Sequence, residues 1–227
     1  MPVAAVTALI VYHRRAGHLD RAIRGIRAQS LEAEVWVVCN EGQGMPKSCE
    51  EKADVVIACS RNFGSAVRFP IMGLVRSRWI WTQDDDWEIR DPDLFGQLVD
   101  WYSEEPNRET IYWLTRGGKT LTESRGYAKS GNNVQQGPAP ACNTGYSFLP
   151  TSLVANRLPL NALHCERSLK DEQEMRYADD IWVSAHIQGY VHPAIVAGVH
   201  ETREEEAGLC FDPDHYPTRD AACRRLL

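Results

Sequence analysis

The sequence predicts an α/β protein with a mostly parallel central sheet and helices on both of its faces. Short apolar, β-branched runs alternate with stretches of helical spacing up to about residue 90. This order is typical of βαβ units, which place helices over a parallel sheet. At 227 residues the chain can bury a sizeable core, and we expect one domain.

The N-terminal part predicts four strands joined by helices. The strands share short, β-branched runs and cover residues 6–12, 34–39, 54–59 and 78–82. Residues 19–29 form an amphipathic helix, with apolar residues on one face and arginines opposite. A second helix opens at residues 62–65. Its expected buried face consists of Val67, Ile71, Leu74 and Val75.

The pattern is less regular in the second half. Helices are expected at residues 94–102 and 178–188, and strands at 110–114, 142–149 and 191–199. A long loop at residues 116–140 is rich in Gly, Asn, Gln and Ser, which is typical of a functional segment. The tail, residues 201–227, mixes acids, arginines and two prolines. We expect it to be irregular and to lie on the surface.

Composition narrows the class of protein. The net charge of -6 argues against a general electrostatic grip on nucleic acid. The seven cysteines form no C-x-x-C pair, which favours neither a disulfide framework nor a zinc site and fits a reducing cytoplasm. The apolar run at residues 3–11 is too short to span a bilayer, and we expect no transmembrane segment.

Three consecutive acids, Asp84, Asp85 and Asp86, follow an apolar strand-like run. Because side chains alternate along an extended chain, Asp84 and Asp86 can face the same way and share a divalent cation, which offsets their repulsion. The alternative is an acidic, solvated turn. Ligands of parallel sheets bind beyond the carboxyl ends of the strands, and this placement favours the metal site.

A second acidic pair, Asp179 and Asp180, falls in the first turn of the helix expected at residues 178–188. Acids at this position stabilise a helix through capping and the macrodipole, which is the structural interpretation. The functional interpretation is a general base that takes a proton from an attacking hydroxyl. His200 follows the last expected strand, where it can supply an imidazole to the metal, although a lone histidine is more often not a ligand.

Taken in order, these features resemble a glycosyltransferase of the GT-A fold and the family 2 type. The resemblance covers nearly the whole chain. It rests on the strand ending near Asn40 and Glu41, on Asn62-x-Gly64, on the Asp84-Asp85-Asp86 triplet, on Asn143-Thr144-Gly145, on Asp179-Asp180 and on His200. It implies a single GT-A domain over residues 1–227. The donor-binding half covers about 1–90, the acceptor-binding half about 91–200, and the tail 201–227.

The resemblance also implies roles for individual residues. A D-x-D motif, Asp84 and Asp86, holds Mn²⁺ or Mg²⁺ against the donor diphosphate, with Asp86 as the direct ligand and His200 as a further one. Asp180 or Asp179 becomes the base. The implied donor-binding residues are Tyr12, Asn40, Glu41, Asn62, Gly64, Arg68, Asp84 and Asp85. The implied acceptor-binding residues are Asn143, Thr144, Gly145 and Trp182.

The implied reaction moves a sugar from a nucleotide-sugar donor to a hydroxyl acceptor. A divalent cation stabilises the charge that grows on the leaving diphosphate, and one base without a second nucleophile favours inversion. Family members usually carry an Asp pair where this chain has Asn40 and Glu41, so the nucleobase stays open. Asp85 is expected to contact sugar or backbone.

The acceptor also stays open between a glycan, a small molecule and a modified DNA base. Some viral enzymes of this broad type glycosylate DNA bases, in which case the location is the host cytoplasm. The alternatives are a nucleotide-sugar hydrolase, a nucleotidyltransferase of similar fold, a metal-dependent nuclease, and a noncatalytic nucleotide-sugar-binding protein. A nucleotidyltransferase should carry a Gly-rich phosphate loop after the first strand, where this chain has Tyr12-His13-Arg14-Arg15.

Overall fold

The computed structural model describes most of the chain. It covers residues 4–40, 44–104, 112–115, 117–121, 126–127, 134–142, 145–158, 170–202 and 213–227. Glu41, Asn143 and Thr144, which the sequence assigns to the site, lie outside these ranges.

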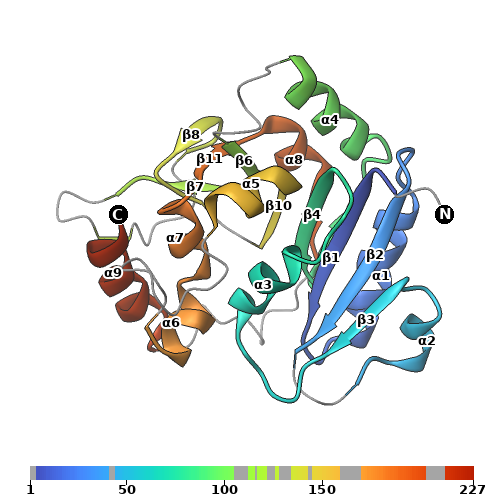
Figure 1. Cartoon of the computed structure of the whole chain (residues 1–227), viewed down its shortest axis with the longest axis horizontal. Coiled ribbons are helices and arrows are strands. Elements are labelled where there is room, and N and C mark those ends of the chain that lie inside the picture. The colour runs from blue at the N-terminus through green and yellow to red at the C-terminus, as the bar shows by residue number, and fades with distance from the viewer. Residues whose placement is uncertain are drawn as a thin grey trace.

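An eight-stranded sheet forms the centre of the described structure, in the order β3-β2-β1-β4-β10-β6-β11-β8 (Figure 1). Its strands are β1 (Val6–Tyr12), β2 (Ala33–Cys39), β3 (Val55–Ala58), β4 (Trp79–Asp84), β6 (Tyr112–Thr115), β8 (Gly137–Ala139), β10 (Tyr146–Pro150) and β11 (Gln188–Val191). Strands β3, β2, β1 and β4 run parallel, as do β6 and β11, while β10 and β8 are antiparallel to their neighbours. The mostly parallel sheet is therefore confirmed.

Two small antiparallel pairs lie beside the main sheet. One joins β5 (Trp87–Ile89) to β12 (Val199–Glu201), and the other joins β7 (Gly118–Lys119) to β9 (Ala141–Cys142). The first pair places residues 199–202 directly next to the acidic triplet, since Thr202 donates its backbone N–H to the Asp86 carbonyl at 2.8 Å.

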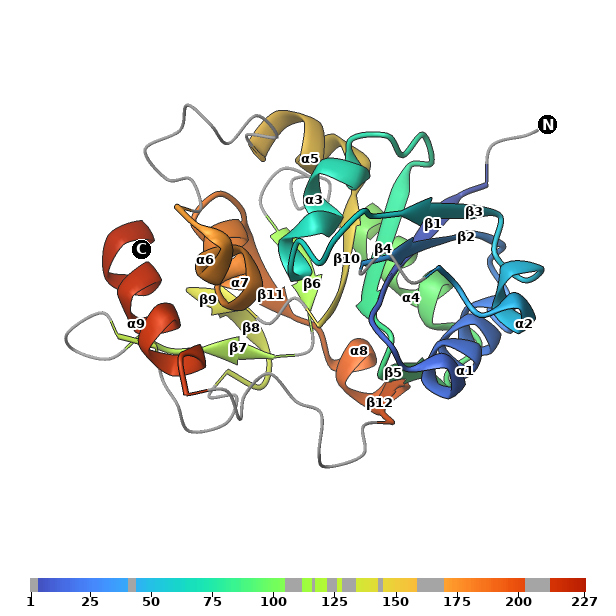
Figure 2. The same ribbon diagram turned by 90° about the horizontal axis from the view of Figure 1, so that it is seen from below.

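Helices cover both faces of the sheet, as Figure 2 shows with α3 and α5 on one side and α1, α4 and α8 on the other. The helices are α1 (Ala16–Arg27), α2 (Lys47–Glu50), the 3₁₀ turn η1 (Ser65–Val67), α3 (Arg68–Met72), α4 (Leu94–Glu104), α5 (Thr151–Arg157), α6 (Glu172–Tyr177), α7 (Asp179–Ser184), α8 (Pro193–Gly198) and α9 (His215–Leu226). Alternate residues of β1 belong to two different hydrophobic cores. Ile10 lies in the core that includes residues of α1 and α4, and Leu9 lies in the core that includes residues of α3 and α7. No helix among the described residues is long and apolar enough to cross a membrane.

Two elements expected from the sequence are wrong. Residues 191–199 do not form one strand: β11 ends at Val191, Pro193 opens α8, and β12 begins at Val199. Proline favours the first turn of a helix, and the His192 ring accepts the Ala194 N–H at 3.2 Å, so the helix prevails over the β-branched pattern.

The tail is not irregular either. Its last residues form α9, which buries Arg219, Ala222, Cys223 and Leu226. These positions follow the i, i+3, i+4, i+7 spacing of an amphipathic helix. Smaller differences concern Leu74, which is 63% exposed rather than buried, and the helix at residues 178–188, which ends at Ser184.

Candidate active site

The candidate active site lies at the edge of the sheet where parallel strands β1, β2 and β4 end. Tyr12 pairs with Cys39, and Val11 pairs with Asp84, so the loops that follow these strands start side by side. Gly145, at the start of antiparallel β10, reaches the same edge and accepts the Asp84 N–H at 2.7 Å. This edge is where ligands bind in parallel sheets.

Asp84 is the last residue of β4, and Arg68 of α3 holds its carboxylate. Arg68 is fully buried, donates to Asp84 Oδ1, and donates from Nε to the Ser65 carbonyl at 2.9 Å. The Asp84 side chain is 36% exposed, so part of it faces solvent. Burial raises the pKa of Asp84, the cation of Arg68 opposes that rise, and the charge of Asp86 adds to it.

Asp85 and Asp86 form the turn that follows the end of β4 at Asp84. Both contact Arg15: Nε lies 3.4 Å from Asp85 Oδ1, and Nη1 lies 2.6 Å from Asp86 Oδ2. Asp85 also accepts the His13 backbone N–H at 2.8 Å, and burial raises its pKa to about 7. The two acids of the turn therefore share one arginine.

One carboxylate oxygen of this turn, Asp86 Oδ1, lacks a hydrogen-bond partner among the described residues. This oxygen is buried. Buried carboxylate oxygens are normally satisfied, so an unsatisfied one marks a position that suits a bound cation.

A turn formed by Asn62, Phe63 and Gly64 lies beside Asn40, which follows the end of β2. Asn40 braces it from the end of β2: its amide donates to the Gly64 carbonyl at 2.8 Å and accepts the Phe63 N–H at 2.9 Å. Gly64 has φ +75°, and a Cβ at this position would lie 2.7 Å from the Met175 carbonyl of α6. Asn40 therefore shapes this region through the backbone of the turn.

A cavity of about 220 Å³ opens between the ends of β1 and β2. Its lining combines aromatic, amide, thiol and guanidinium groups from Tyr12, Arg14, Cys39, Asn40, Gly44, Met45 and Pro46. Arg14 has φ +66°, which is uncommon outside glycine and is often found at functional positions. Burial raises the pKa of Cys39 to about 11, so a protonated thiol lines this cavity at neutral pH.

Asp179 and Asp180 occupy the first turn of α7 and are both buried. Asp179 Oδ2 lies 3.9 Å from Arg68 Nε, so Asp179 and Asp84 contact the same arginine. Asp180 pairs instead with Arg219 of α9. Burial raises the pKa of Asp180, and the Arg219 cation opposes the rise.

His200 and Trp182 are two further residues that the sequence assigns to the site. His200 is exposed on β12 and pairs in the strand register with Glu88. The described residues contain no cluster of three His, Cys, Asp or Glu side chains that could hold a metal ion, so the structure does not bring His200 together with Asp84 and Asp86. The Trp182 ring packs on Phe69 of α3, with ring centroids 5.1 Å apart, and is 3% exposed.

Arg15 and Arg219 could not be predicted as site residues from the sequence, because a lone arginine carries no motif. The sequence feature that could have indicated Arg15 is its position three residues after the first strand, in the loop that precedes α1. Arg219 lay in the segment expected to be irregular. Both become visible only when the chain is folded.

No protein-family model matches the sequence, and no curated protein matches it. Solved structures do match. The mannosyltransferase PcManGT from Pyrobaculum calidifontis, solved with GDP-Man and Mn²⁺, has a TM-score of 0.58 at 12% identity, over 91% of this chain and 59% of that one. S. aureus TarS 1–349 has a TM-score of 0.55 at 12% identity, over 83% and 58%. A second TarS structure has a TM-score of 0.51 at 13% identity, over 82% and 36%.

The chain thus spans less than two thirds of each of these structures. At such identities the likeness establishes the fold, and it agrees with the resemblance found in the sequence. The chain has a GT-A-like glycosyltransferase fold.

Proposed function

We propose that the protein is a glycosyltransferase that moves a sugar from a nucleoside-diphosphate donor to an acceptor hydroxyl. The observation that carries the proposal is the grouping of Asp84, Asp86 and Asp179 around Arg68 and Arg15 at the ligand-binding edge of a GT-A-like fold. The similar structure of PcManGT supports it, since that protein is a mannosyltransferase and was solved with GDP-Man and Mn²⁺.

Asp84 and Asp86 would hold Mn²⁺ or Mg²⁺. Their hard oxygen ligands fit either ion, and the unsatisfied Oδ1 of Asp86 offers a coordination position. Mg²⁺ sites commonly use one or two carboxylates together with substrate phosphates, so a complete cage of protein ligands is not required. His200 stays a predicted further ligand. When bound, the cation stabilises the negative charge that develops on the leaving diphosphate.

The protein side chains supply the rest of the site. Arg15 and Arg68 fix the orientation of the carboxylates, which lowers the cost of ordering them when a ligand binds. We place the nucleoside in the cavity lined by Tyr12, Cys39 and Asn40, with Glu41 as a further predicted contact. Because the Asn40 amide braces the neighbouring turn, the nucleobase contacts would come from the other lining groups.

The acidic pair of α7 supplies the base. As the acceptor oxygen attacks the anomeric carbon, its proton passes to a carboxylate, the new C–O bond forms, and the bond to the diphosphate breaks with its electron pair. A single displacement of this kind inverts the anomeric centre. The acceptor is a hydroxyl of a glycan, a small molecule or a modified DNA base, with Gly145 and the predicted residues Asn143, Thr144 and Trp182 on its side.

A thermal-shift screen tests the proposal. UDP, GDP, CDP and ADP are each added with and without Mn²⁺. We expect one base to raise the Tm by about 5–10 °C when present at about 100 times its Kd, and only with the metal. The same screen on Asp86→Ala should show no Mn²⁺-dependent shift. If no nucleotide shifts the wild-type Tm, the protein does not bind this class of donor.

A further inference from the structure

Asp179 and Asp180 are neighbours in sequence, but two arginines from distant parts of the chain hold them. Successive residues of an α-helix point about 100° apart, so the two carboxylates leave α7 in different directions. Asp179 points toward Arg68 on the donor side, and Asp180 points toward Arg219 of the C-terminal helix. The pair is therefore divided between two surroundings.

Both oxygens of Asp180 are committed to fixed donors. Oδ1 accepts the Ile181 N–H at 2.8 Å, and Oδ2 accepts from Arg219. Asp180 is 3% exposed and Arg219 is 6% exposed, so neither group exchanges this contact for water. A general base must come within hydrogen-bond reach of the acceptor hydroxyl, which these contacts oppose.

Two guanidinium nitrogens of Arg219, Nη1 and Nη2, donate hydrogen bonds, whereas its Nε has no hydrogen-bond partner among the described residues. Its Nη1 donates to the Tyr177 carbonyl at 2.6 Å, and its guanidinium carbon lies 4.0 Å from the centre of the Tyr127 ring. Asp220, the next residue of α9, accepts the Tyr127 backbone N–H at 2.8 Å. Arg219 therefore connects α9, the last residue of α6 and the Tyr127 ring to the Asp180 carboxylate.

Asp179 has a different environment. Its Oδ2 lies 3.9 Å from Arg68 Nε, and the same arginine donates to Asp84. Asp179 thus faces the carboxylates to which the donor diphosphate and its cation are assigned. An acceptor hydroxyl that attacks the donor must approach on this side.

We propose that Arg219 is a positioning residue that locks Asp180 as a buried strut for α9, and that Asp179 is the general base. This inference rests on the proposed function. In the transfer, Asp179 takes the proton of the acceptor hydroxyl while the acceptor oxygen bonds to the anomeric carbon and the diphosphate leaves with the electron pair. Asp180 keeps its charge and its partner throughout.

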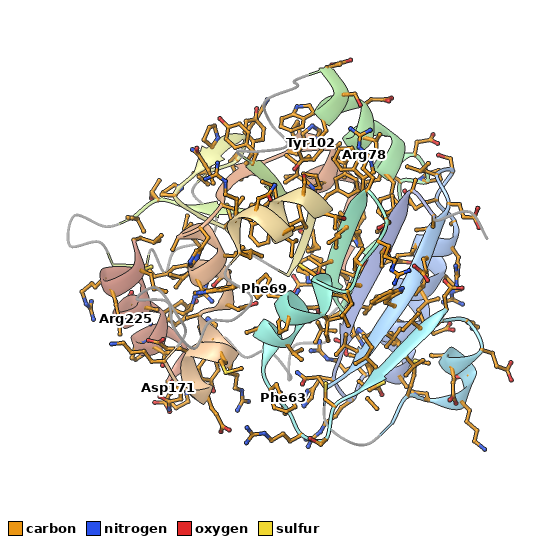
Figure 3. All side chains as sticks on the ribbon, viewed as in Figure 1. Phe63, Phe69, Arg78, Tyr102, Asp171 and Arg225 are labelled. Carbon is orange, nitrogen blue, oxygen red and sulfur yellow. The ribbon has the colours of Figure 1, made fainter. Side chains whose placement is uncertain are left out.

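The test compares Asp179→Asn, Asp180→Asn, Arg219→Gln, Arg219→Lys and the double variant Asp180→Asn/Arg219→Gln. Each is measured for Tm, for donor Kd, and for kcat and KM in nucleoside-diphosphate release from the nucleotide-sugar that the wild type uses. Arg225→Gln is the matched control, because Arg225 of α9, which Figure 3 labels, also fastens this helix, through an ion pair with Glu174 of α6.

Asp179→Asn should lower kcat by at least about 100-fold while donor Kd stays as in the wild type. Asp180→Asn should lower the Tm by about 10 °C, because it leaves Arg219 buried without its partner, and should lower kcat by less than about tenfold. The double variant should regain much of that Tm. Arg219→Gln should lower kcat at unchanged donor Kd, Arg219→Lys should restore part of it, and Arg225→Gln should leave kcat unchanged.

The opposite pattern overturns the inference. In that pattern Asp180→Asn is folded but its kcat is about 100-fold lower, and Asp179→Asn stays active. It is also overturned if Arg219→Gln and Arg225→Gln behave alike. If the wild type turns over no nucleotide-sugar, the proposed function fails and the base assignment with it. The Tm values of the single and double variants then still decide the strut, since independent, additive shifts would refute it.

Discussion

Arginine side chains contact each of the five carboxylates that gather at the candidate site. Arg15 serves Asp85 and Asp86, Arg68 serves Asp84 and Asp179, and Arg219 serves Asp180. Arginine suits this role because its planar fork stays charged and can bind two acceptors at once. Without these cations, the neighbouring carboxylates would repel one another.

Gly64 should be intolerant of any side chain. Gly64→Ala combines a positive φ with a Cβ 2.7 Å from a backbone oxygen of α6, and we expect it to lower the free energy of unfolding by about 2–4 kcal/mol. Gly44→Ala is the control, because Gly44 has φ +73° but nothing within 4 Å of the added Cβ. We expect a loss of about 1 kcal/mol there. Urea unfolding measures both, and equal losses would contradict the close approach of the turn to α6.

Cys39 should react slowly with iodoacetamide. Burial raises its pKa to about 11, above the ordinary value, so the folded protein holds the thiol proton up to that pH. At pH 8 about one thiol in a thousand is then ionised, against about a quarter for an unperturbed cysteine. Peptide mass spectrometry should show alkylation of Cys39 more than about 100-fold slower in native than in urea-unfolded protein. Equal rates would mean that the cavity is open to solvent at this thiol.

At the scale of the elements, the sequence predicted what local periodicity controls. Strand β1 has the expected bounds, and β2, β3 and β4 differ from expectation by one or two residues, because β-branched runs and a buried sheet give the same signal. The segment at 191–199 could not be placed in this way, since its apolar residues suit a strand or a buried helix equally and only Pro193 separates the two.

Helix α9 should contribute substantially to stability. Leu226 is 3% exposed and belongs to the core shared with α7, so Leu226→Ala should lower the free energy of unfolding by about 2–4 kcal/mol. Leu74→Ala is the control: Leu74 is 63% exposed, and we expect a change within about 0.5 kcal/mol. Chemical denaturation of the two variants tests this. If Leu226→Ala were as stable as the control, α9 would not be docked on the core.

At the scale of the whole molecule, the site joins segments that lie far apart in the sequence. Arg15 lies in the loop between β1 and α1, Arg68 is the first residue of α3, between β3 and β4, and Arg219 belongs to α9. The acidic residues could be selected from the sequence because they form short motifs next to strand and helix ends. Their arginine partners could not, since pairing over such separations depends on the finished topology.

The central claim is that Asp86 helps to bind a divalent cation together with a nucleoside-diphosphate donor. Calorimetric titration of the nucleoside diphosphate chosen by the thermal-shift screen, with and without Mn²⁺, tests it most directly. The test variant is Asp86→Ala, in which Arg15 keeps Asp85 as a partner. The control is Asp100→Ala, which removes an exposed carboxylate of α4.

Wild type and Asp100→Ala should bind at least about tenfold more tightly with Mn²⁺ than without it, a difference of about 1.4 kcal/mol, and Asp86→Ala should lose this gain. An Asp86→Ala variant that keeps the full Mn²⁺-dependent affinity would contradict the account.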